Sequence, residues 1–353
     1  MEKKINIFLV GTGNVGKSLI ELIAHDNLYK IAGKKFRIRI IGIANRSKMY
    51  FSRQSINANK WKSLLTKGKT ANVDLFIETM KHYKLPDTIL VDCMNGDEIS
   101  RYYKVILKQF PIVASNKSSN SGSYKNYSAI RDTIKKYNTD FRYSANVGVG
   151  LPSTDIINSF LSGGDKVTAI EGLFSSTMNY LLDKLLTTDK PFSRLLVEAK
   201  EKGLTEPDPR NDLNGIDTAR KILILARESG AKIEMNDIKI ENLVPVILRN
   251  IKSLDKFYHS IKIADSKFDA MKRVAMKNKR KLVYSARFKD NKASVGIEMV
   301  DAVHPFYSVS ANEKVVLFYT EFFKHHPLVI KGESGGAKET ASVLISDILK
   351  TVL

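Results

Sequence analysis

The feature that most constrains the fold is a glycine-rich turn close to the N-terminus. A short apolar run at residues 5–10 leads into it, and a helical pattern of apolar residues begins directly after it. The turn reads Gly11-Thr12-Gly13-Asn14-Val15-Gly16. Between a strand and a helix, this spacing allows a tight turn, a close approach of backbone to a pyrophosphate, and close packing of helix on strand. The N–H groups at the helix N-terminus also favour an anion. We therefore predict a dinucleotide site here; a glycine-rich turn without a ligand is the alternative.

The end of the second strand, expected at 37–44, bears on the choice of cofactor. An NAD site usually carries a carboxylate there for the ribose 2′-hydroxyl. This chain has Asn45-Arg46-Ser47-Lys48 instead, which supplies two cations, a hydroxyl and no carboxylate. The set suits a 2′-phosphate, so NADP(H) is favoured and NAD(H) stays open. A basic loop in a basic protein is the alternative.

Strand and helix patterns alternate through the first half of the chain. Further apolar strands are expected at 88–92 and 111–114, and helical segments at 72–83, 97–109 and 124–138. This alternation predicts an α/β fold with an N-terminal Rossmann-type, doubly wound parallel sheet, whose ligands lie at the carboxyl ends of the strands. Met94, Ser115 and Lys117 follow those strands. Residues 118–123 are rich in Ser, Asn and Gly, which predicts a flexible loop beside the site.

The pattern changes after residue 150. The second half predicts an α+β domain with a mixed, open sheet; its strands are expected at 167–174, 281–288, 292–299, 314–319 and 327–331, and its helices at 156–161, 216–228 and within 242–276. We expect residues 1–150, completed by 332–353, to bind the nucleotide. Residues 151–331 are expected to form the substrate-binding, catalytic and dimerisation domain.

The stretch from Glu206 to Lys221 is the densest in chemically useful side chains. Pro207 and Pro209 make its first part a loop, because neither fits inside a helix. The helix expected at 216–228 places Asp217 and Lys221 on one face. Taken alone, that pair reads as an exposed ion pair worth about 0.3–0.5 kcal/mol.

Charge and composition limit the class of protein. The net charge is +20, but lysines are spread along the chain. The densest cluster, within 272–281, has no aromatic residue before Tyr284 and is interpreted as a solvated helix face; nucleic-acid binding is the alternative. An excess of positive charge still attracts anionic ligands.

No apolar run reaches about 18 residues, so we expect no transmembrane helix. The first residues enter a strand pattern, so we expect no signal peptide, and Cys93 is the only cysteine; both favour a cytoplasmic protein.

Several motifs together resemble one known family. They are the glycine turn, Asn116-Lys117, the segments 145–152 and 171–180, and the stretch Glu206 to Lys221. Their order and spacing resemble homoserine dehydrogenase over essentially the whole chain, and the last motif is the most specific. The chain is similar to the short monofunctional form, so we expect neither a fused aspartokinase nor an ACT domain.

The resemblance implies an NAD(P)-dependent interconversion of L-homoserine and L-aspartate 4-semialdehyde, a step toward threonine, methionine and isoleucine. It implies a homodimer, and Lys221, Asp217 and Lys117 as catalytic residues. The residues implied for substrate binding are Thr177, Glu206, Asp212, Asp217 and Lys221. Beyond the glycine turn and residues 45–48, those implied for the cofactor are Met94, Ser115, Lys117 and Gly336. The backbone carbonyls implied for a monovalent cation, usually sodium, belong to Ser144, Val147, Val149 and Leu151.

The chain departs from the family pattern at four positions. Ser144 replaces the usual Glu of the cation turn, Ser176 replaces a Gly, Met94 replaces a frequent Thr, and Glu333 stands where small residues are usual. The departures at Ser176, Met94 and Glu333 leave open a dinucleotide-binding module without catalysis. Another two-domain NAD(P) oxidoreductase of an amino-acid-like substrate would share the Rossmann half but should lack the Glu206–Lys221 stretch.

Overall fold

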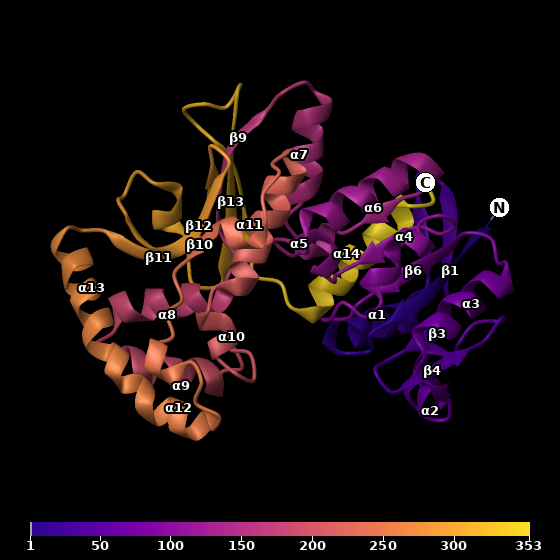
Figure 1. Cartoon of the computed structure of the whole chain (residues 1–353), viewed down its shortest axis with the longest axis horizontal. Coiled ribbons are helices and arrows are strands. Elements are labelled where there is room, and N and C mark those ends of the chain that lie inside the picture. The colour runs from indigo at the N-terminus through magenta and orange to yellow at the C-terminus, as the bar shows by residue number, and fades with distance from the viewer. Residues whose placement is uncertain (1) are drawn as a thin grey trace. The chain divides into compact units, whose positions relative to one another are not determined.

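The computed structural model describes residues 2–353, and the chain divides into two compact units. The first contains the residues up to Gly150 together with Gly335–Leu353, and the second contains Leu151–Ser334. In Figure 1 the first unit is drawn in indigo and purple with the yellow C-terminal helix, and the second runs from magenta through orange to gold. None of the helices in the described part of the chain is long and apolar enough to span a membrane.

The sheet of the first unit has a parallel centre. Its parallel strands are β1 (Glu2–Val10), β3 (Lys34–Ala44), β6 (Thr88–Asp92), β7 (Ile112–Ala114) and β8 (Phe141–Arg142). They lie in the order β3-β1-β6-β7-β8. The chain moves outward from β1 to β3, then returns across β1 to β6, so the strand order reverses between β1 and β6. Ligands of such sheets bind at the carboxyl end of that reversal point. The predicted Rossmann-type sheet is confirmed.

Three short antiparallel strands at the edge of this sheet were not predicted. They are β2 (Leu28–Ile31), β4 (Lys48–Phe51) and β5 (Lys69–Thr70), and a short helix α2 (Trp61–Thr66) lies between the last two. The prediction treated residues 45–48 as a loop, whereas Lys48 opens β4. These strands are too short to show a clear alternation of apolar and polar residues, which is why the pattern missed them.

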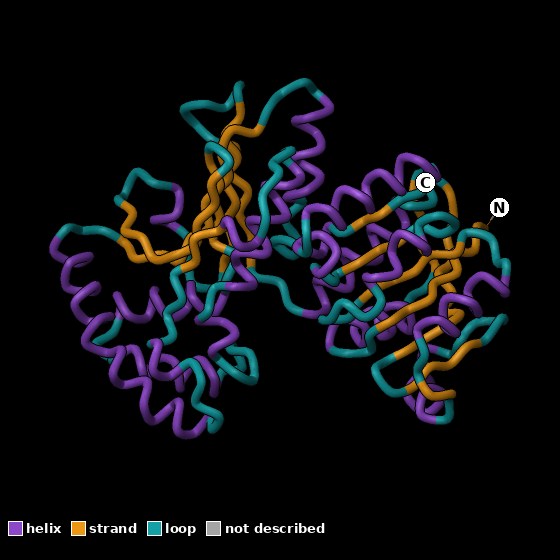
Figure 2. The backbone as a smooth tube through the Cα atoms, viewed as in Figure 1, coloured by secondary structure: helices purple, strands orange, loops and turns teal. Residues whose placement is uncertain are grey.

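Helices cover both faces of the sheet, as Figure 2 shows. Alternate residues of β1 point to opposite faces: Ile5 and Ile7 belong to one buried cluster and Phe8 to the other. The first cluster includes residues of α1 (Asn14–His25) and α14 (Ala337–Lys350). The second includes residues of α3 (Val73–Tyr83), α4 (Tyr103–Ile106) and α6 (Tyr124–Tyr137). Burial on both faces explains why residues 7–10 of β1 are all apolar.

Two predictions for the first unit were wrong. The helix expected at 97–109 is a 3-10 turn at Ser100–Tyr102 followed by the short α4. The flexible loop expected at 118–123 is instead the helix α5 (Ser118–Ser121), in which Ser119 and Asn120 are buried. A Ser- and Asn-rich composition suggested solvent exposure, but the segment is buried, and the Asn120 amide joins a polar network described below.

The second unit is built on a mixed sheet, as predicted. Its strands are β9 (Val167–Leu173), β10 (Ile238–Ile240), β11 (Lys281–Lys289), β12 (Lys292–Val300), β13 (Glu313–Thr320) and β14 (Leu328–Glu333). The order is β10-β12-β11-β9-β13-β14, antiparallel except for the parallel pair β10 and β12. The helices are α7 (Ser153–Ser162), α8 (Ser176–Thr187), α9 (Phe192–Glu201), α10 (Arg210–Leu213), α11 (Ile216–Glu228), α12 (Leu254–Ser260) and α13 (Asp265–Lys277).

Helix α11 has the predicted bounds and packs on this sheet. Its stripe of Ala219, Ile222 and Leu223 is fully buried, and α11 contacts β9, β11 and β12. The helical stretch expected within 242–276 is broken. It holds a 3-10 turn after Pro245, then α12 and α13, because a proline and a short Ser-capped loop interrupt the apolar periodicity.

Candidate functional site

The glycine turn of the first unit has the geometry that a pyrophosphate requires. Gly11 has φ of +89°, and a Cβ there would lie 2.6 Å from the carbonyl of Cys93. A Cβ on Gly16 would lie 1.9 Å from the carbonyl oxygen of Gly11. A Cβ on Gly13, by contrast, would meet no atom of the described chain within 4 Å. Gly13 is also the N-cap of α1, and no described side chain caps that helix. The first and third glycines are thus needed for packing, and the second leaves open space at a helix N-terminus.

A cavity of about 300 Å³ lies at the carboxyl ends of β1, β3 and β6. Its wall is mostly apolar, with some polar side chains; the lining is Val10, Ala44, Asn45, Arg46, Ala71, Asn72, Val73, Phe76, Met94, Glu98 and Ile99. An apolar slot with a polar rim fits the adenine end of a dinucleotide. Asn45, Arg46 and Met94 were predicted for the cofactor. Asn72, Phe76 and Glu98 were missed, because no motif marks residues that long-range folding brings to this edge.

Within the loop after β3, the four predicted residues have different surroundings. The Asn45 side-chain oxygen accepts hydrogen bonds from the N–H groups of Ser47 and Lys48 at 2.9 and 2.7 Å, and from the Ser47 hydroxyl at 3.1 Å. Lys48 donates to the Gly68 carbonyl at 3.3 Å. Asn45 therefore shapes the turn and Lys48 ties it to the neighbouring segment, while Arg46 lines the cavity.

On the other side of the reversal point, Ser115 and Lys117 follow β7. Ser115 donates its N–H to the carbonyl of Asp92 at 3.0 Å. Lys117 is the N-cap of α5, and its carbonyl accepts from the N–H groups of Asn120 and Ser121 at 3.1 and 2.9 Å. The backbone at Lys117 is therefore held by the start of a buried helix, which the sequence did not suggest.

In the second unit the structure brings together three of the residues predicted for the substrate. The hydroxyl of Thr177, in the first turn of α8, lies 2.9 Å from Oδ1 of Asp212 and 2.6 Å from the carbonyl oxygen of Leu204. The N–H of Glu206 donates to Oδ2 of Asp212 at 2.8 Å. Burial raises the pKa of Asp212, against the lowering effect of these two hydrogen bonds. Both oxygens of Asp212 are thus engaged in holding the loop, and the Glu206 side chain is exposed.

The Asp217–Lys221 pair is not an exposed surface pair. The ammonium of Lys221 lies 2.6 Å from the Asp217 carboxylate and donates to the Phe174 carbonyl at 2.9 Å. The Lys221 side chain is 15% exposed, whereas that of Asp217 is 52% exposed. An ammonium has three N–H donors. Two of them account for the contacts with Asp217 and with the Phe174 carbonyl.

The positions implied for a cation are divided between the units. Ser144, Val147 and Val149 belong to the first unit and Leu151 to the second. The N–H and hydroxyl of Ser144 both donate to the fully buried carboxylate of Asp347 in α14, at 3.0 and 2.9 Å. The N–H and the hydroxyl of Ser144 thus bind it to α14, whereas its carbonyl oxygen takes no part in these hydrogen bonds. The cation site stays a prediction.

Gly336, implied for the cofactor, is the N-cap of α14. Its N–H donates to the side chain of Glu339 at 2.8 Å. A phosphate at this N-terminus would therefore have to compete with Glu339. The role of Gly336 in cofactor binding also stays a prediction.

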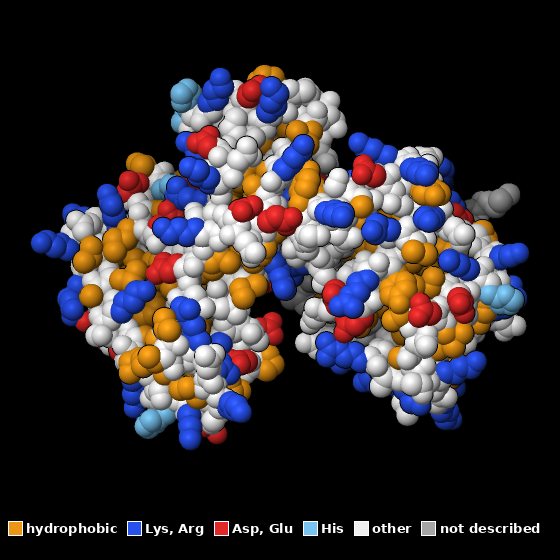
Figure 3. Space-filling model, in the orientation of Figure 1, with side chains coloured by type: hydrophobic (Ala, Val, Ile, Leu, Met, Phe, Trp, Pro, Cys, Tyr) orange, Lys and Arg blue, Asp and Glu red, His pale blue; other side chains and the backbone are white. Residues whose placement is uncertain are grey.

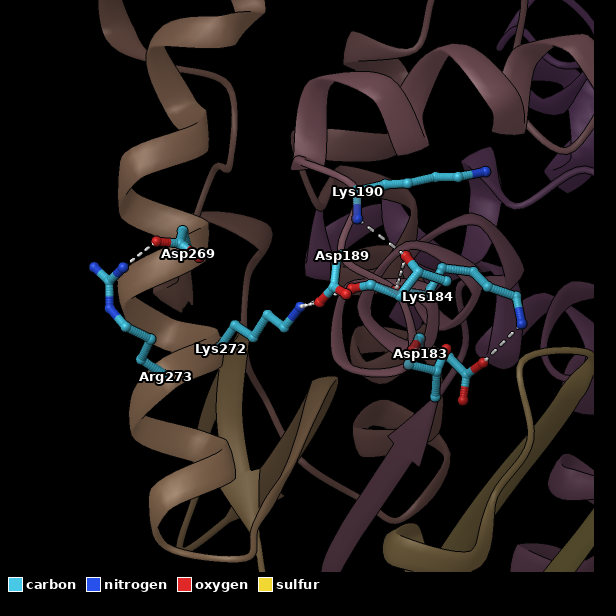
Figure 4. A network of polar contacts seen from close by, with 9 residues as sticks. Asp183, Lys184, Asp189, Lys190, Asp269, Lys272 and Arg273 are labelled. Carbon is cyan, nitrogen blue, oxygen red and sulfur yellow. Dashed lines mark hydrogen bonds and ion pairs between the residues drawn. The ribbon is translucent and has the colours of Figure 1, made fainter.

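The densest basic cluster is a helix face with acidic partners. Figure 4 shows Lys272 of α13 pointing at Asp189, which lies 3.3 Å away, and Arg273 pointing at Asp269. Lys272 also donates to the Thr188 carbonyl at 2.7 Å. On the face drawn in Figure 3, Lys and Arg side chains are scattered among Asp and Glu. Arg273 and residues 277–280 are exposed, in agreement with a solvated face, whereas the Lys272 side chain is only 14% exposed.

Comparison with protein families covers nearly all of the chain. Residues 11–144 match the family model described as homoserine dehydrogenase, NAD binding domain, and residues 152–349 match the one described as homoserine dehydrogenase. The chain belongs to the homoserine dehydrogenase family. The predicted family is therefore confirmed, and with it a nicotinamide-cofactor domain followed by a catalytic domain.

Individual relatives agree. The chain is 35% identical over 347 residues to the bifunctional aspartokinase/homoserine dehydrogenase 1 of Arabidopsis thaliana; the match covers 97% of this chain and 38% of that protein. It is 31% identical to the homoserine dehydrogenase of Schizosaccharomyces pombe, covering 98% of this chain and 95% of the relative. A crystal structure of a Candida auris protein of unknown function superimposes with a TM-score of 0.89 at 29% identity, covering 99% of this chain and 98% of that one.

Proposed function

We propose that this protein is a homoserine dehydrogenase that interconverts L-homoserine and L-aspartate 4-semialdehyde with NAD(P)(H). Membership of the family supports the reaction, and one observation supports its chemistry. Lys221 is a largely buried ammonium fixed between Asp217 and the Phe174 carbonyl. It belongs to the same unit as the linked set Thr177, Asp212 and Glu206.

The nicotinamide, when bound, supplies or accepts the hydride at the substrate's C4. The residues of this chain then manage the proton and the charge. Lys221 gives a proton to the nascent alkoxide in aldehyde reduction and removes it in alcohol oxidation. Asp217 orients Lys221 through the 2.6 Å ion pair. Lys117 supplies a second cation that stabilises the developing alkoxide.

The amino group of the substrate needs an anionic partner. Glu206 has an exposed carboxylate, while its N–H is fixed by Asp212. We assign the ammonium contact to Glu206 and assign Asp212 to holding Glu206 and Thr177 in place. The hydrogen bond that each oxygen of Asp212 already makes supports this division of labour.

We favour NADP(H) over NAD(H) because Arg46 lines the cavity and the loop after β3 has no carboxylate. A guanidinium binds a 2′-phosphate with bidentate geometry. The glycine turn would hold the pyrophosphate through the N-terminus of α1. Titration of the purified protein with NADPH and with NADH compares the two affinities directly.

The remaining proposals concern assembly and the cation. We propose a cytoplasmic homodimer that binds sodium at the carbonyls of Ser144, Val147, Val149 and Leu151. Sedimentation equilibrium tests the dimer, and turnover in sodium, potassium and choline salts tests the cation.

The decisive experiment measures the absorbance of reduced nicotinamide with L-homoserine as substrate, first with NADP and then with NAD. We expect homoserine-dependent reduction of at least one cofactor. A second reaction, with L-aspartate 4-semialdehyde and the reduced cofactor, should run in reverse. Absence of turnover with both cofactors, in a protein that still binds NADPH, would refute the dehydrogenase and favour a binding module.

A further inference from the structure

Asn116 directly precedes Lys117, and every polar atom of its side chain makes a hydrogen bond. Its amide nitrogen donates to the Asp92 carboxylate at 2.9 Å and to the Gly96 carbonyl at 2.7 Å. Its amide oxygen accepts from the N–H of Ser118 at 3.0 Å. An amide has two N–H donors, so both are used and the side chain has one orientation.

Asp92 lies at the end of β6 and is fully buried. Its Oδ2 accepts from the hydroxyl of Tyr103 at 2.7 Å as well as from Asn116, and its Oδ1 accepts from the N–H of Met94 at 2.8 Å. Each of these partners is a donor, which matches an ionised carboxylate that only accepts. Asp92 therefore joins the backbone after β6, at the cofactor cavity, to the loop after β7.

Ionisable groups surround this carboxylate. Burial raises the pKa of Asp92 to about 6, the hydrogen bonds from Tyr103, Met94 and Asn116 lower it, and the charge of Glu98 raises it. The neighbouring Cys93 thiol and Tyr103 hydroxyl have raised pKa values through burial and through Asp92 itself. A buried charge is costly unless hydrogen bonds compensate for it, so the network depends on all of its donors.

The backbone on both sides of Lys117 is attached to this network. The Ser118 hydroxyl lies 3.2 Å from the Gly96 carbonyl oxygen, which also accepts from Asn116. The amide of Asn120 continues the network to the Asn146 side chain at 3.0 Å. Lysine is a long side chain with many rotamers, so the position of its ammonium depends on how firmly this backbone is held.

We propose that Asp92 is a positioning residue that fixes Lys117 through Asn116. The proposal rests on the proposed function, in which Lys117 stabilises the alkoxide. Asp92 is not assigned a contact with substrate; it acts through the Asn116 amide and the start of α5. A displacement of about 1 Å at a catalytic group lowers the rate by as much as about 100-fold.

The substitution Asp92→Asn tests this directly. The new amide keeps the shape of the carboxylate but directs an NH₂ either at the Met94 N–H or at the site shared by Tyr103 and Asn116. The Met94 N–H and the Asn116 NH₂ can only donate, and the Tyr103 hydroxyl would have to turn round to accept. We expect kcat to fall by about 10- to 100-fold with a much smaller change in the KM for NADPH. Combining it with Lys117→Ala makes a double-mutant cycle. If Asp92 acts through Lys117, the double variant has the same kcat as Lys117→Ala; additive losses would overturn the proposal.

A second measurement does not depend on turnover. Hydrogen–deuterium exchange of peptides spanning 115–122 should be faster in Asp92→Asn than in the wild type. The matched control is Thr88→Val at the other end of β6, where a buried hydroxyl donates to the Leu85 carbonyl at 2.7 Å. That control should leave both kcat and the exchange of 115–122 unchanged. Wild-type protein without homoserine turnover would refute the proposed function alone; unchanged exchange in Asp92→Asn would refute the positioning role.

Discussion

Removing the ammonium of Lys221 should lower the activity of the enzyme much more than its stability. Loss of a general acid or base lowers turnover by about 100- to 10,000-fold, which is about 3 to 5 kcal/mol in activation free energy. The loss of stability should be smaller. Asp217 is half exposed, so its ion pair contributes at most about 1 kcal/mol. The Phe174 carbonyl loses one hydrogen bond, at about 1 to 3 kcal/mol if no water replaces it.

The chain offers a matched control for Lys221→Ala. Lys272 is 14% exposed, donates to a backbone carbonyl at 2.7 Å and pairs with the exposed Asp189. It therefore loses the same kinds of bonds on truncation, at a place to which we assign no chemistry. Lys272→Ala should have a similar shift in thermal midpoint and near-wild-type kcat.

The assay is steady-state oxidation of L-homoserine, with thermal unfolding and NADPH titration on the same preparations. We expect Lys221→Ala to lose turnover by at least about 100-fold and to keep its NADPH affinity, because the bonds of Lys221 are to Phe174 and Asp217, outside the glycine turn. If Lys221→Ala keeps turnover within a few-fold of Lys272→Ala, Lys221 is not the acid/base group.

Three further outcomes follow from the first unit. Arg46→Ala should weaken NADPH binding by about 10- to 100-fold, as expected for lost charge-assisted bonds, and leave NADH binding nearly unchanged; equal losses in a titration would contradict the 2′-phosphate contact. Gly16→Ala should lower the free energy of unfolding by about 1 to 3 kcal/mol. Gly13→Ala should instead weaken the binding of NADPH and of NADH without that loss of stability. Chemical denaturation measures the first effect, and cofactor titration measures the second. Asp92 has a folded pKa raised to about 6 from 3.8, so the folded state binds its proton more tightly. Asp92 therefore makes the free energy of unfolding decrease as the pH rises from about 4 to 6, by about 3 kcal/mol at most. In Asp92→Asn, this dependence of stability on pH should disappear. If it persists, another group is responsible for it.

Local patterns predicted the architecture because they report on short-range geometry. The spacing of Gly11, Gly13 and Gly16 between an apolar run and a helical stripe was enough for a dinucleotide turn, and the apolar period at 216–228 predicted α11 with its observed bounds. Strand and helix patterns predicted both sheets for the same reason: burial of one face or both leaves a repeating signature in the sequence.

Contacts between distant segments decided the rest. As a sequence pair, Asp217 and Lys221 looked like a surface ion pair, and only the approach of the β9 end makes Lys221 a largely buried donor. The sequence predicted Asp212 as a substrate ligand but did not show its contacts with the Thr177 hydroxyl, 35 residues away, and with the Glu206 backbone.

The same holds for the loop after Lys117, which composition assigned to solvent. Whether a Ser- and Asn-rich segment is mobile or buried depends on the partners available to it, and here a carboxylate at the end of another strand, Asp92, reaches it through the Asn116 amide. The sequence by itself therefore determined the family, the two sheets and the residue types at the site. Tertiary structure decided which of those side chains are free to act and which hold the others in place, because burial and hydrogen-bond partnership are properties of the folded chain rather than of any local segment.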